Sequence, residues 1–346
     1  MNSSQTRNLL VADPNSLRRE MILQACASHP ALRGHGASTV AELYRQTESL
    51  MPAYVALAVE FAQMREFTAL ASLFDMIGAE LVIHGETPMS SLSYRCFRVV
   101  GPNDATSLVD ALAPSSAAAT GNPPGPPRRV PSPGPITQVV PQRDPAKAPE
   151  IIAIAGSTGG IVAIEKILLE FPEDCPPTLV VQHIRPGFAD GLVRRLDRIV
   201  APRVVGAIDG GAIHRGHVYV ATDSERHLGL ISRAGLRARL LDAPEVSGHR
   251  PSIDVLFDSL AQLGGRHRIS ACLLTGMGAD GADGMVNLRA NGAYTIAQDK
   301  ETSVIWGMPQ AAIQRGGAAV VLPLDRIAPA LLAGRAALSR VEGFVK

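Results

Sequence analysis

Apolar residues in the first 112 positions alternate between short runs and longer stretches with helical periodicity. Short runs rich in β-branched residues predict strands, which lie at residues 8–12, 54–59, 80–84 and 97–100. Stretches with apolar residues at helical spacing predict amphipathic helices, which lie at residues 14–27, 40–50 and 64–76. Strands that alternate with helices in this way are typical of a small doubly wound α/β unit.

The same alternation returns after residue 150 on a larger scale. The predicted strands lie at residues 151–156, 178–184, 217–222, 227–232, 269–276, 293–298 and 318–324. The predicted helices lie at residues 160–171, 188–199, 252–263, 281–291, 307–315 and 325–341. Near-continuous apolar strands indicate a parallel sheet covered on both faces. The runs at 217–222 and 227–232 are expected to pair with each other as antiparallel strands. The predicted fold class is α/β, with two doubly wound, mostly parallel domains of different size.

Residues 113–149 separate these two regions and differ from both in composition. The segment is rich in Pro, Gly, Ser and Ala and has almost no large apolar residues, so it cannot offset the entropy of ordering itself. It is predicted to be a semi-extended linker between a domain at 1–112 and a domain at 150–346. An ordered loop inside one domain is the alternative, but structureless loops of this length are rare.

Composition and charge narrow the class of partner. The 346-residue chain has a net charge of +1, which gives no electrostatic case for nucleic acid or an anionic membrane. No apolar run reaches membrane-spanning length, and the first residues lack the pattern of a signal peptide, so we expect a cytoplasmic protein without direct membrane insertion. The four cysteines are scattered without a CxxC pair, which predicts reduced thiols and no metal site.

A glycine-rich turn, "GSTGG" at residues 156–160, joins a predicted strand to a predicted helix. Such a turn can cradle a phosphate, hold a nucleophile, or only let the helix pack closely on the strand. A P-loop needs a lysine at its end, but the first lysine after Gly156 is Lys166, well inside the helix. Ala155 and Thr158 also break the GxGxxG pattern of a dinucleotide site.

The nucleophile hypothesis requires partners for Ser157 at other strand ends. One strand ends at His183, and another leads into a glycine-rich loop that carries Asp280. In a doubly wound sheet, chemistry gathers beyond the carboxyl ends of the strands. A serine needs a base, and a histidine base needs a carboxylate to fix its tautomer. A single strand-end histidine is more often structural, and spacing alone does not establish that the three side chains converge.

Six blocks of sequence resemble, in order and spacing, the catalytic domain of bacterial protein-glutamate methylesterases over essentially all of residues 150–335. The blocks are "IAGSTGG", "VVQHIRPGFADGLVRRLD", "GHVYVA", "HRPSIDVLFDSLA", "LLTGMGADGADGM" and "AQDKETSVIWGMPQAAI". The resemblance implies a catalytic triad of Ser157, His183 and Asp280, with backbone N–H groups near Thr158 and Met277 facing the oxyanion. Two small departures, at Arg185-Pro186 and in the "ATDSERH" turn, lie away from these residues.

The resemblance also implies the reaction. Members of this family hydrolyse glutamyl γ-methyl esters on chemoreceptors in chemotaxis, and some also deamidate receptor glutamines. A methylated chemoreceptor or receptor-like protein is therefore the expected partner. Nothing in the sequence calls for a metal or an organic cofactor.

In this family a phosphorylatable receiver domain precedes the linker, and residues 7–112 resemble a receiver in outline only. A receiver holds Mg²⁺ with an acidic pair and needs an aspartate acceptor and a lysine. Here Asp13 alone is left of the pair, Ala58 stands at the acceptor position with Glu60 two residues on, and Gly101 replaces the lysine. We expect a pseudo-receiver that docks a kinase or scaffold partner but does not accept phosphate.

Two other functions compete with an active methylesterase. One is a catalytically silent regulatory protein that acts through the pseudo-receiver, and the other is an esterase for small molecules. The complete set of Ser157, His183 and Asp280 favours an active enzyme over the first. The receiver-like attachment disfavours the second.

Overall fold

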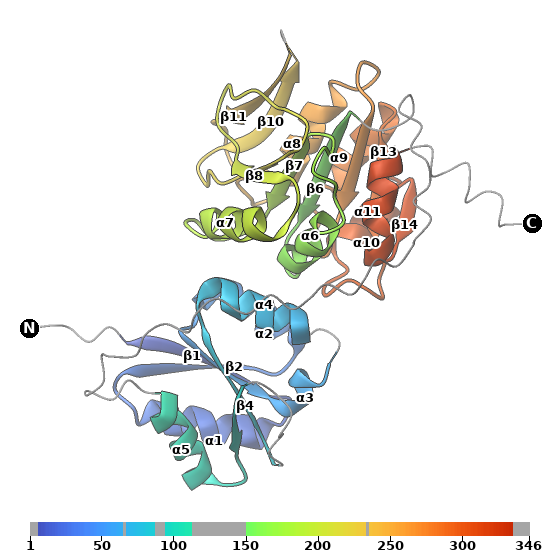
Figure 1. Ribbon diagram of the computed structural model, residues 1–346. Helices are drawn as coiled ribbons and strands as arrows, with labels where there is room; N and C mark the ends of the chain where they lie inside the picture. The colour runs from blue at the N-terminus through green and yellow to red at the C-terminus, as the bar shows by residue number, and fades with distance from the viewer. Residues whose placement is uncertain (1–5, 65–66, 87–93, 113–149, 233–234, 335–346) are drawn as a thin grey trace, which may run out of the picture.

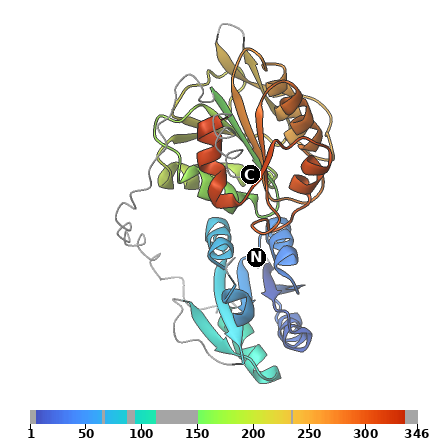
Figure 2. The same ribbon diagram turned by 90° about the vertical axis from the view of Figure 1, so that its right-hand side faces the viewer.

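The apolar runs form two parallel β-sheets, one before and one after residue 150 (Figures 1 and 2). The computed structural model describes residues 6–64, 67–86, 94–112, 150–232 and 235–334. Each sheet carries helices on both faces, which confirms the predicted α/β class. The predicted linker at 113–149 lies outside the described residues, so the domain boundaries stay a prediction.

The N-terminal sheet has five parallel strands in the order β2-β1-β3-β4-β5, which is a doubly wound order. Its strands are β1 (Arg7–Ala12), β2 (Leu32–Ala37), β3 (Tyr54–Ala58), β4 (Glu80–Gly85) and β5 (Arg95–Arg98). Its helices are α1 (Ser16–Ala27), α2 (Val40–Leu50), α3 (Val59–Ala62), α4 (Phe67–Ile77) and α5 (Pro102–Leu112). Helices α1 and α5 pack on one face of the sheet, and α2, α3 and α4 pack on the other.

Three of these elements, β2, α3 and α5, were not predicted. Strand β2 has the sequence LRGHGA and lies at the edge of the sheet, where polar residues are tolerated. Its glycines leave room for α1, since a Cβ at Gly34 would lie 3.0 Å from the side chain of Leu23. At α5, Asp104 accepts hydrogen bonds from the amides of Val100 and Gly101 and so caps the start of the helix.

The second sheet has seven parallel strands in the order β14-β13-β12-β6-β7-β9-β8. Its strands are β6 (Ile151–Gly156), β7 (Thr178–Gln182), β8 (Arg203–Gly206), β9 (His217–Val220), β12 (Ile269–Leu273), β13 (Tyr294–Gln298) and β14 (Val320–Leu322). Its helices are α6 (Gly160–Leu168), α7 (Ala189–Ile199), α8 (Ile253–Ala261), α9 (Ala282–Ala290), α10 (Met308–Gln314) and α11 (Leu324–Ala333). The predicted extension of the last helix to residue 341 falls partly outside the described residues.

The predicted antiparallel pairing of 217–222 with 227–232 was wrong. Strand β9 lies inside the large sheet, parallel to both β7 and β8. Strand β10 (His227–Ser232) instead pairs antiparallel with β11 (Leu236–Leu241) in a separate hairpin. The last three residues of β9, Val218–Val220, are all buried, as is typical of a strand covered on both faces, whereas β11 alternates apolar residues with exposed Arg237 and Arg239.

Alternation along β6 explains why the central strands are apolar throughout. Ile152 and Ile154 belong to the core under α6, α7 and α11, whereas Ile151 and Ala153 belong to the core under α8, α9 and α10. Successive side chains of a strand point to opposite faces, so a strand covered on both sides needs apolar residues at every position.

Strand order reverses at β6. The next strands of the chain continue on one side of β6, through β7, whereas β12, β13 and β14 follow on its other side. The register places Gly156 of β6 opposite Gln182 of β7, and Ala155 opposite Leu273 of β12. The residues that follow these three strands therefore meet at one point of the carboxyl edge, which is where open α/β sheets bind ligands.

The two sheets are joined in space through helix α4. It packs on α6 and α7 (Figures 1 and 2). Its buried residues Leu70, Leu73 and Phe74 belong to the same apolar cluster as Ile161 and Ile164 of α6. None of the helices in the described part of the chain has the length and hydrophobicity that crossing a bilayer requires.

Candidate active site

Ser157 is fixed by its backbone in the turn between β6 and α6. Its N–H donates to the carbonyl of Thr275 at 3.0 Å, and its own carbonyl accepts from the Gly160 N–H at 2.7 Å. The Gln182 Nε2 donates to the same carbonyl at 2.8 Å. Gly159 has φ of +79°, a conformation that favours glycine, and this explains one of the turn's glycines. The main chain at Ser157 is thus held by three neighbouring segments.

His183 lies at the equivalent position of the neighbouring strand. Its N–H donates to the carbonyl of Gly156 at 3.0 Å, and Gln182 Nε2 donates to its carbonyl at 3.0 Å. Neighbouring strands lie about 4.8 Å apart. Gly156 of β6 is paired with Gln182 of β7, and Ser157 and His183 are the next residues of the two strands' segments. Their side chains therefore start from adjacent backbones.

Asp280 joins His183 to the start of helix α8. Its carboxylate accepts from His183 Nε2 at 2.8 Å, from Ser252 Oγ at 2.7 Å, and from the N–H groups of Ile253 at 2.8 Å and Asp254 at 3.2 Å. These two N–H groups belong to the first turn of α8, where helix geometry leaves donors without internal partners. Asp280 is 1% exposed, so its charge is compensated by these hydrogen bonds and not by water.

The surroundings shift the pKa values of Asp280, Asp254 and His183 in different directions. Burial alone raises the pKa of Asp280, but the hydrogen bonds from His183, Ile253 and Ser252 outweigh it and lower that pKa to about 2. For Asp254, burial raises the pKa to about 6, and the charge of Asp280 acts in the same direction. Burial lowers the pKa of His183 against the opposing effect of Asp280. At neutral pH Asp280 is therefore ionised and His183 is neutral.

Several atoms that a serine hydrolase would use have no hydrogen-bond partner in the described part of the chain. Within the described residues, neither the Ser157 hydroxyl nor the buried Nδ1 of His183 has a hydrogen-bond partner. In the same part of the chain, the N–H groups of Thr158 and Met277 have none either. The structure thus brings His183 and Asp280 into direct contact, and the strand register places Ser157 next to His183 in the neighbouring chain segment. Hydrogen bonds of this kind are often open in the absence of substrate.

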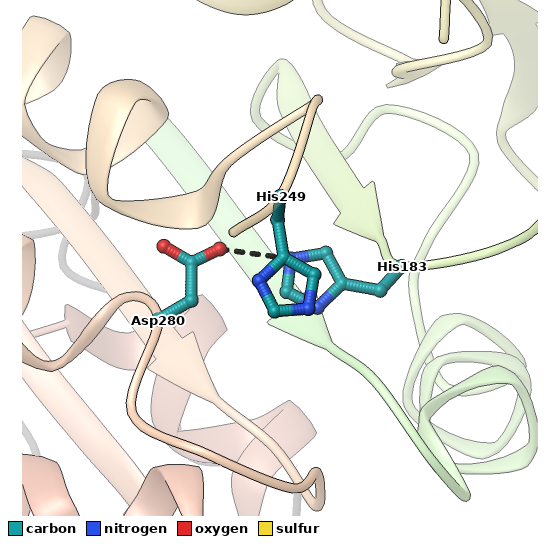
Figure 3. A group of neighbouring side chains, drawn as sticks. All are labelled: His183, His249 and Asp280. Atoms are coloured by element: carbon teal, nitrogen blue, oxygen red, sulfur yellow. Dashed lines mark hydrogen bonds and ion pairs between the residues drawn. The ribbon is translucent and has the colours of Figure 1, made fainter. Parts of the chain in front are cut away.

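The sequence analysis missed His249, whose ring stacks on that of His183 (Figure 3). The ring centroids are 3.8 Å apart and the ring planes differ by 6°. The residue stands in the quoted block "HRPSIDVLFDSLA", but no spacing rule pointed from it to His183. With Asp280 these two histidines form a candidate metal cluster. They do not suit a metal ion, because stacked rings direct their nitrogen lone pairs along parallel planes and Asp280 is fully engaged by its four donors.

Comparison with known proteins agrees with this geometry. Residues 152–331 match the CheB methylesterase family. A protein-glutamate methylesterase/protein-glutamine glutaminase of Agrobacterium fabrum is 34% identical over 98% of this chain and 99% of its own length. The chain belongs to the CheB methylesterase family. The predicted resemblance is thereby confirmed.

Other relatives match about half of this chain. A protein of Pseudomonas aeruginosa with the name protein-glutamate methylesterase/protein-glutamine glutaminase 2 is 45% identical over 53% of this chain and 52% of its own length. The crystal structure of the Thermotoga maritima CheB methylesterase catalytic domain is 36% identical, with a TM-score of 0.51 over 53% of this chain and 97% of that one.

The N-terminal sheet of this CheB-family chain has its own buried charged cluster at the ends of its strands. Asp13 is fully buried after β1, and Arg18 of α1 contacts it through Nε at 2.5 Å and Nη2 at 2.9 Å. Arg18 Nη2 also donates to Glu60 at 2.6 Å. The hydrogen bond to Asp13, partly opposed by burial, raises the pKa of Arg18 further. One guanidinium thus pairs with both acidic residues that the sequence analysis singled out.

The other two positions that the sequence analysis compared with a receiver, Ala58 and Gly101, carry no charged side chain. Ala58 ends β3 fully buried, and Gly101 has open space where its side chain would be. His84 at the end of β4 is buried with both ring nitrogens unpaired among the described residues, 3.6 Å from Asp13. Burial lowers the pKa of His84 to about 4 against the attraction of Asp13, so this ring is neutral at pH 7.

Replacing Arg18 by methionine should destabilise the N-terminal sheet by about 3 kcal/mol, because it leaves Asp13 buried without its cation. The matched control is Arg95→Met. Arg95 also contacts a glutamate at 2.6 Å, but this ion pair is exposed, so its loss should cost less than about 1 kcal/mol. Hydrogen exchange of the β1 and β3 amides measures the N-terminal sheet separately. Equal effects of the two substitutions would contradict the prediction.

Proposed function

We propose that this protein hydrolyses glutamyl γ-methyl esters on a chemoreceptor, with Ser157 as nucleophile, His183 as base and Asp280 as the carboxylate that orients the base. The observation that carries this proposal is the 2.8 Å contact between His183 and the ionised Asp280 beside Ser157, in a chain of the CheB methylesterase family. Hydrolysis of receptor glutamine amides follows the same route.

In the first step, Ser157 Oγ attacks the ester carbonyl carbon and its proton passes to His183 Nδ1. This nitrogen is the free one, because Nε2–H donates to Asp280. The C=O electron pair moves to oxygen, where the N–H groups of Thr158 and Met277 stabilise the negative charge. Asp280 stabilises the imidazolium. As the tetrahedral intermediate collapses, the proton on Nδ1 moves to the methoxy oxygen and methanol leaves.

In the second step, water attacks the acyl-enzyme and gives its proton to His183 Nδ1. The bond from the acyl carbon to Ser157 Oγ breaks, Oγ takes the proton back, and a glutamate carboxylate is released. For a glutamine substrate the first leaving group is ammonia in place of methanol. This order of proton transfers needs a neutral His183 at the start of each step, as the lowered pKa of His183 provides.

The proposal extends to the N-terminal domain, which we take to be a receiver that is not phosphorylated. Two observations support this. The acceptor position is Ala58, and the Arg18 guanidinium already lies between Asp13 and Glu60, where a divalent cation would need to bind. A kinase or scaffold protein would then act by docking on residues 1–112. The free cysteines agree with a cytoplasmic location.

Replacing Ser157 by alanine should abolish methanol release from methylated receptor membranes, because no nucleophile remains. The variant should stay folded, since the Ser157 hydroxyl makes no hydrogen bond to the described residues. The control is Ser270→Ala, which removes a buried hydroxyl of β12 that also has no described partner. Methanol release near the wild-type rate in Ser157→Ala would exclude this serine from the mechanism.

Replacing Asp280 by asparagine should slow methanol release by about 10⁴-fold, less than the roughly 10⁶-fold loss expected for Ser157→Ala, because the carboxylate acts through His183. The control is Asp258→Asn on the same helix, since the Asp258 carboxylate accepts from Asn287 Nδ2 at 2.7 Å and is not among the groups that contact Asp280 or His183. Single-turnover rates and circular dichroism separate activity from folding. A folded Asp280→Asn variant with undiminished rate would contradict the assigned role.

Acetyl phosphate with Mg²⁺ should leave the methanol release rate of the full-length chain unchanged, because Ala58 cannot accept the phosphoryl group. The controls are Mg²⁺ without the donor and a conventional receiver labelled in parallel. A faster rate, together with acid-stable and base-labile phosphate on the N-terminal domain, would show that an acceptor survives there.

A further inference from the structure

The His249 imidazole covers one face of the His183 ring, and nothing in the reaction described above uses it. Its ring lies 3.8 Å from that of His183 and nearly parallel to it (Figure 3). Stacked aromatic contacts at such a distance restrict rotation of both rings. The base of the proposed triad is thus held on its edge by Asp280 and on its face by His249.

His249 is itself fixed by its own loop. Its Nδ1 lies 2.8 Å from the carbonyl of Ser247, so the neutral ring carries its proton on Nδ1 and donates it there. This hydrogen bond sets the plane of the His249 ring before substrate binds. His183 stacks on a ring that is already oriented.

The same short segment also holds Asp280. Three residues after His249, Ser252 donates its hydroxyl to Asp280 at 2.7 Å, and the next two amides complete the contact. The path from Ser247 to Asp254 therefore fixes the base and its carboxylate together. Ser247 Oγ also donates to Asp254 at 3.2 Å, which closes the loop on itself.

We propose that His249 is a positioning residue of the methylesterase, which holds the His183 ring in the plane that joins Asp280 to Ser157. This inference rests on the proposed function. The ring of His183 must keep Nε2 on Asp280 and direct Nδ1 towards the serine and then the leaving group. Rotation about the Cβ–Cγ bond breaks both alignments, and a stacked ring opposes that rotation.

The stacking also couples the charges of the two histidines. The groups that influence the charge of His183 are Asp280, which favours the imidazolium, and His249, which disfavours it when protonated. Asp254 lies behind Asp280 and hydrogen-bonds to it through its N–H. Burial of His183, to which the His249 ring contributes, lowers its pKa further. Removal of the His249 ring therefore raises the pKa of His183, so that the base is lost at a higher pH.

The test compares His249→Ala and His249→Phe in the full-length protein. The alanine variant should lose about 10- to 100-fold in kcat with little change in KM, because the base is misaligned while receptor binding is kept. The phenylalanine variant keeps a stacked ring and should recover most of this loss. The acid limb of the kcat–pH profile should move upward in both variants, and further in the alanine variant, because it loses burial as well as charge.

The matched control is His217→Ala. His217 has the same local pattern, with Nδ1 3.0 Å from the carbonyl two residues earlier and a ring stacked on Tyr219 at 5.9 Å, but it lies on β9 away from the triad. It should leave both kcat and the pH profile unchanged. Histidine-ring NMR titration of His183 gives its pKa independently of turnover.

Unchanged kcat and an unchanged His183 titration in folded His249→Ala would overturn the inference. The inference would also be overturned if folded His249→Phe lost as much kcat as folded His249→Ala. That result would assign the effect to the hydrogen bond between His249 and Ser247. If His249→Ala does not fold, the phenylalanine variant and its titration decide the question. A wild-type protein that releases no methanol would refute the proposed function, while the NMR titration would still measure the coupling of the two histidines.

Discussion

The buried carboxylate of Asp280 is the interaction on which the rest of the catalytic edge depends. A buried charge is stable only with several donors, and Asp280 obtains them from three elements. Helix α8 supplies its first N–H groups, Ser252 supplies a hydroxyl, and His183 follows directly after β7. The Asp280 carboxylate thus caps the start of α8, fixes Ser252 in the preceding loop and orients the His183 imidazole. Loss of any one of these donors leaves the buried charge of Asp280 less well compensated. The stability of this edge and the orientation of the His183 ring therefore both depend on Asp280.

The N-terminal sheet solves the same electrostatic problem in another way. Asp13 is also a buried strand-end carboxylate, but its main partner is the guanidinium of Arg18 and not a titratable ring. A guanidinium stays charged at every accessible pH, and it fills the space between Asp13 and Glu60. The pairing of Asp280 with a histidine permits proton transfer, whereas the pairing of Asp13 with an arginine is permanent. One buried carboxylate of this chain is therefore paired with a side chain that can titrate, and the other with a side chain that stays charged.

Much of this arrangement could be predicted from sequence, for reasons that differ between elements. Strand β6 and helix α6 were predicted because burial on both faces forces a continuous apolar run, followed by glycines and a helical period. Strand β2 and the β10–β11 pairing were not predicted, because edge and hairpin strands carry polar residues and their partners are set by tertiary contacts. Ser157, His183 and Asp280 were predicted because Ser157 and His183 follow strand ends, Asp280 lies in the loop after a strand, and the surrounding blocks resemble a known family. His249 and Arg18 were missed, since a loop and a helix bring them to their partners through contacts that sequence spacing does not encode.

Helix α4 links the N-terminal sheet to the sheet whose edge carries His183 and Asp280. In a receiver that responds to phosphate, a change at the strand ends must alter the packing of the surrounding helices, and this requires two states of different interaction energy. In this chain Arg18 occupies the space between Asp13 and Glu60 at the strand ends. Helix α4 packs on α6, whose first residue follows Ser157 by only three positions. The packing of α4 on α6 therefore connects the N-terminal sheet to the helix that begins beside Ser157.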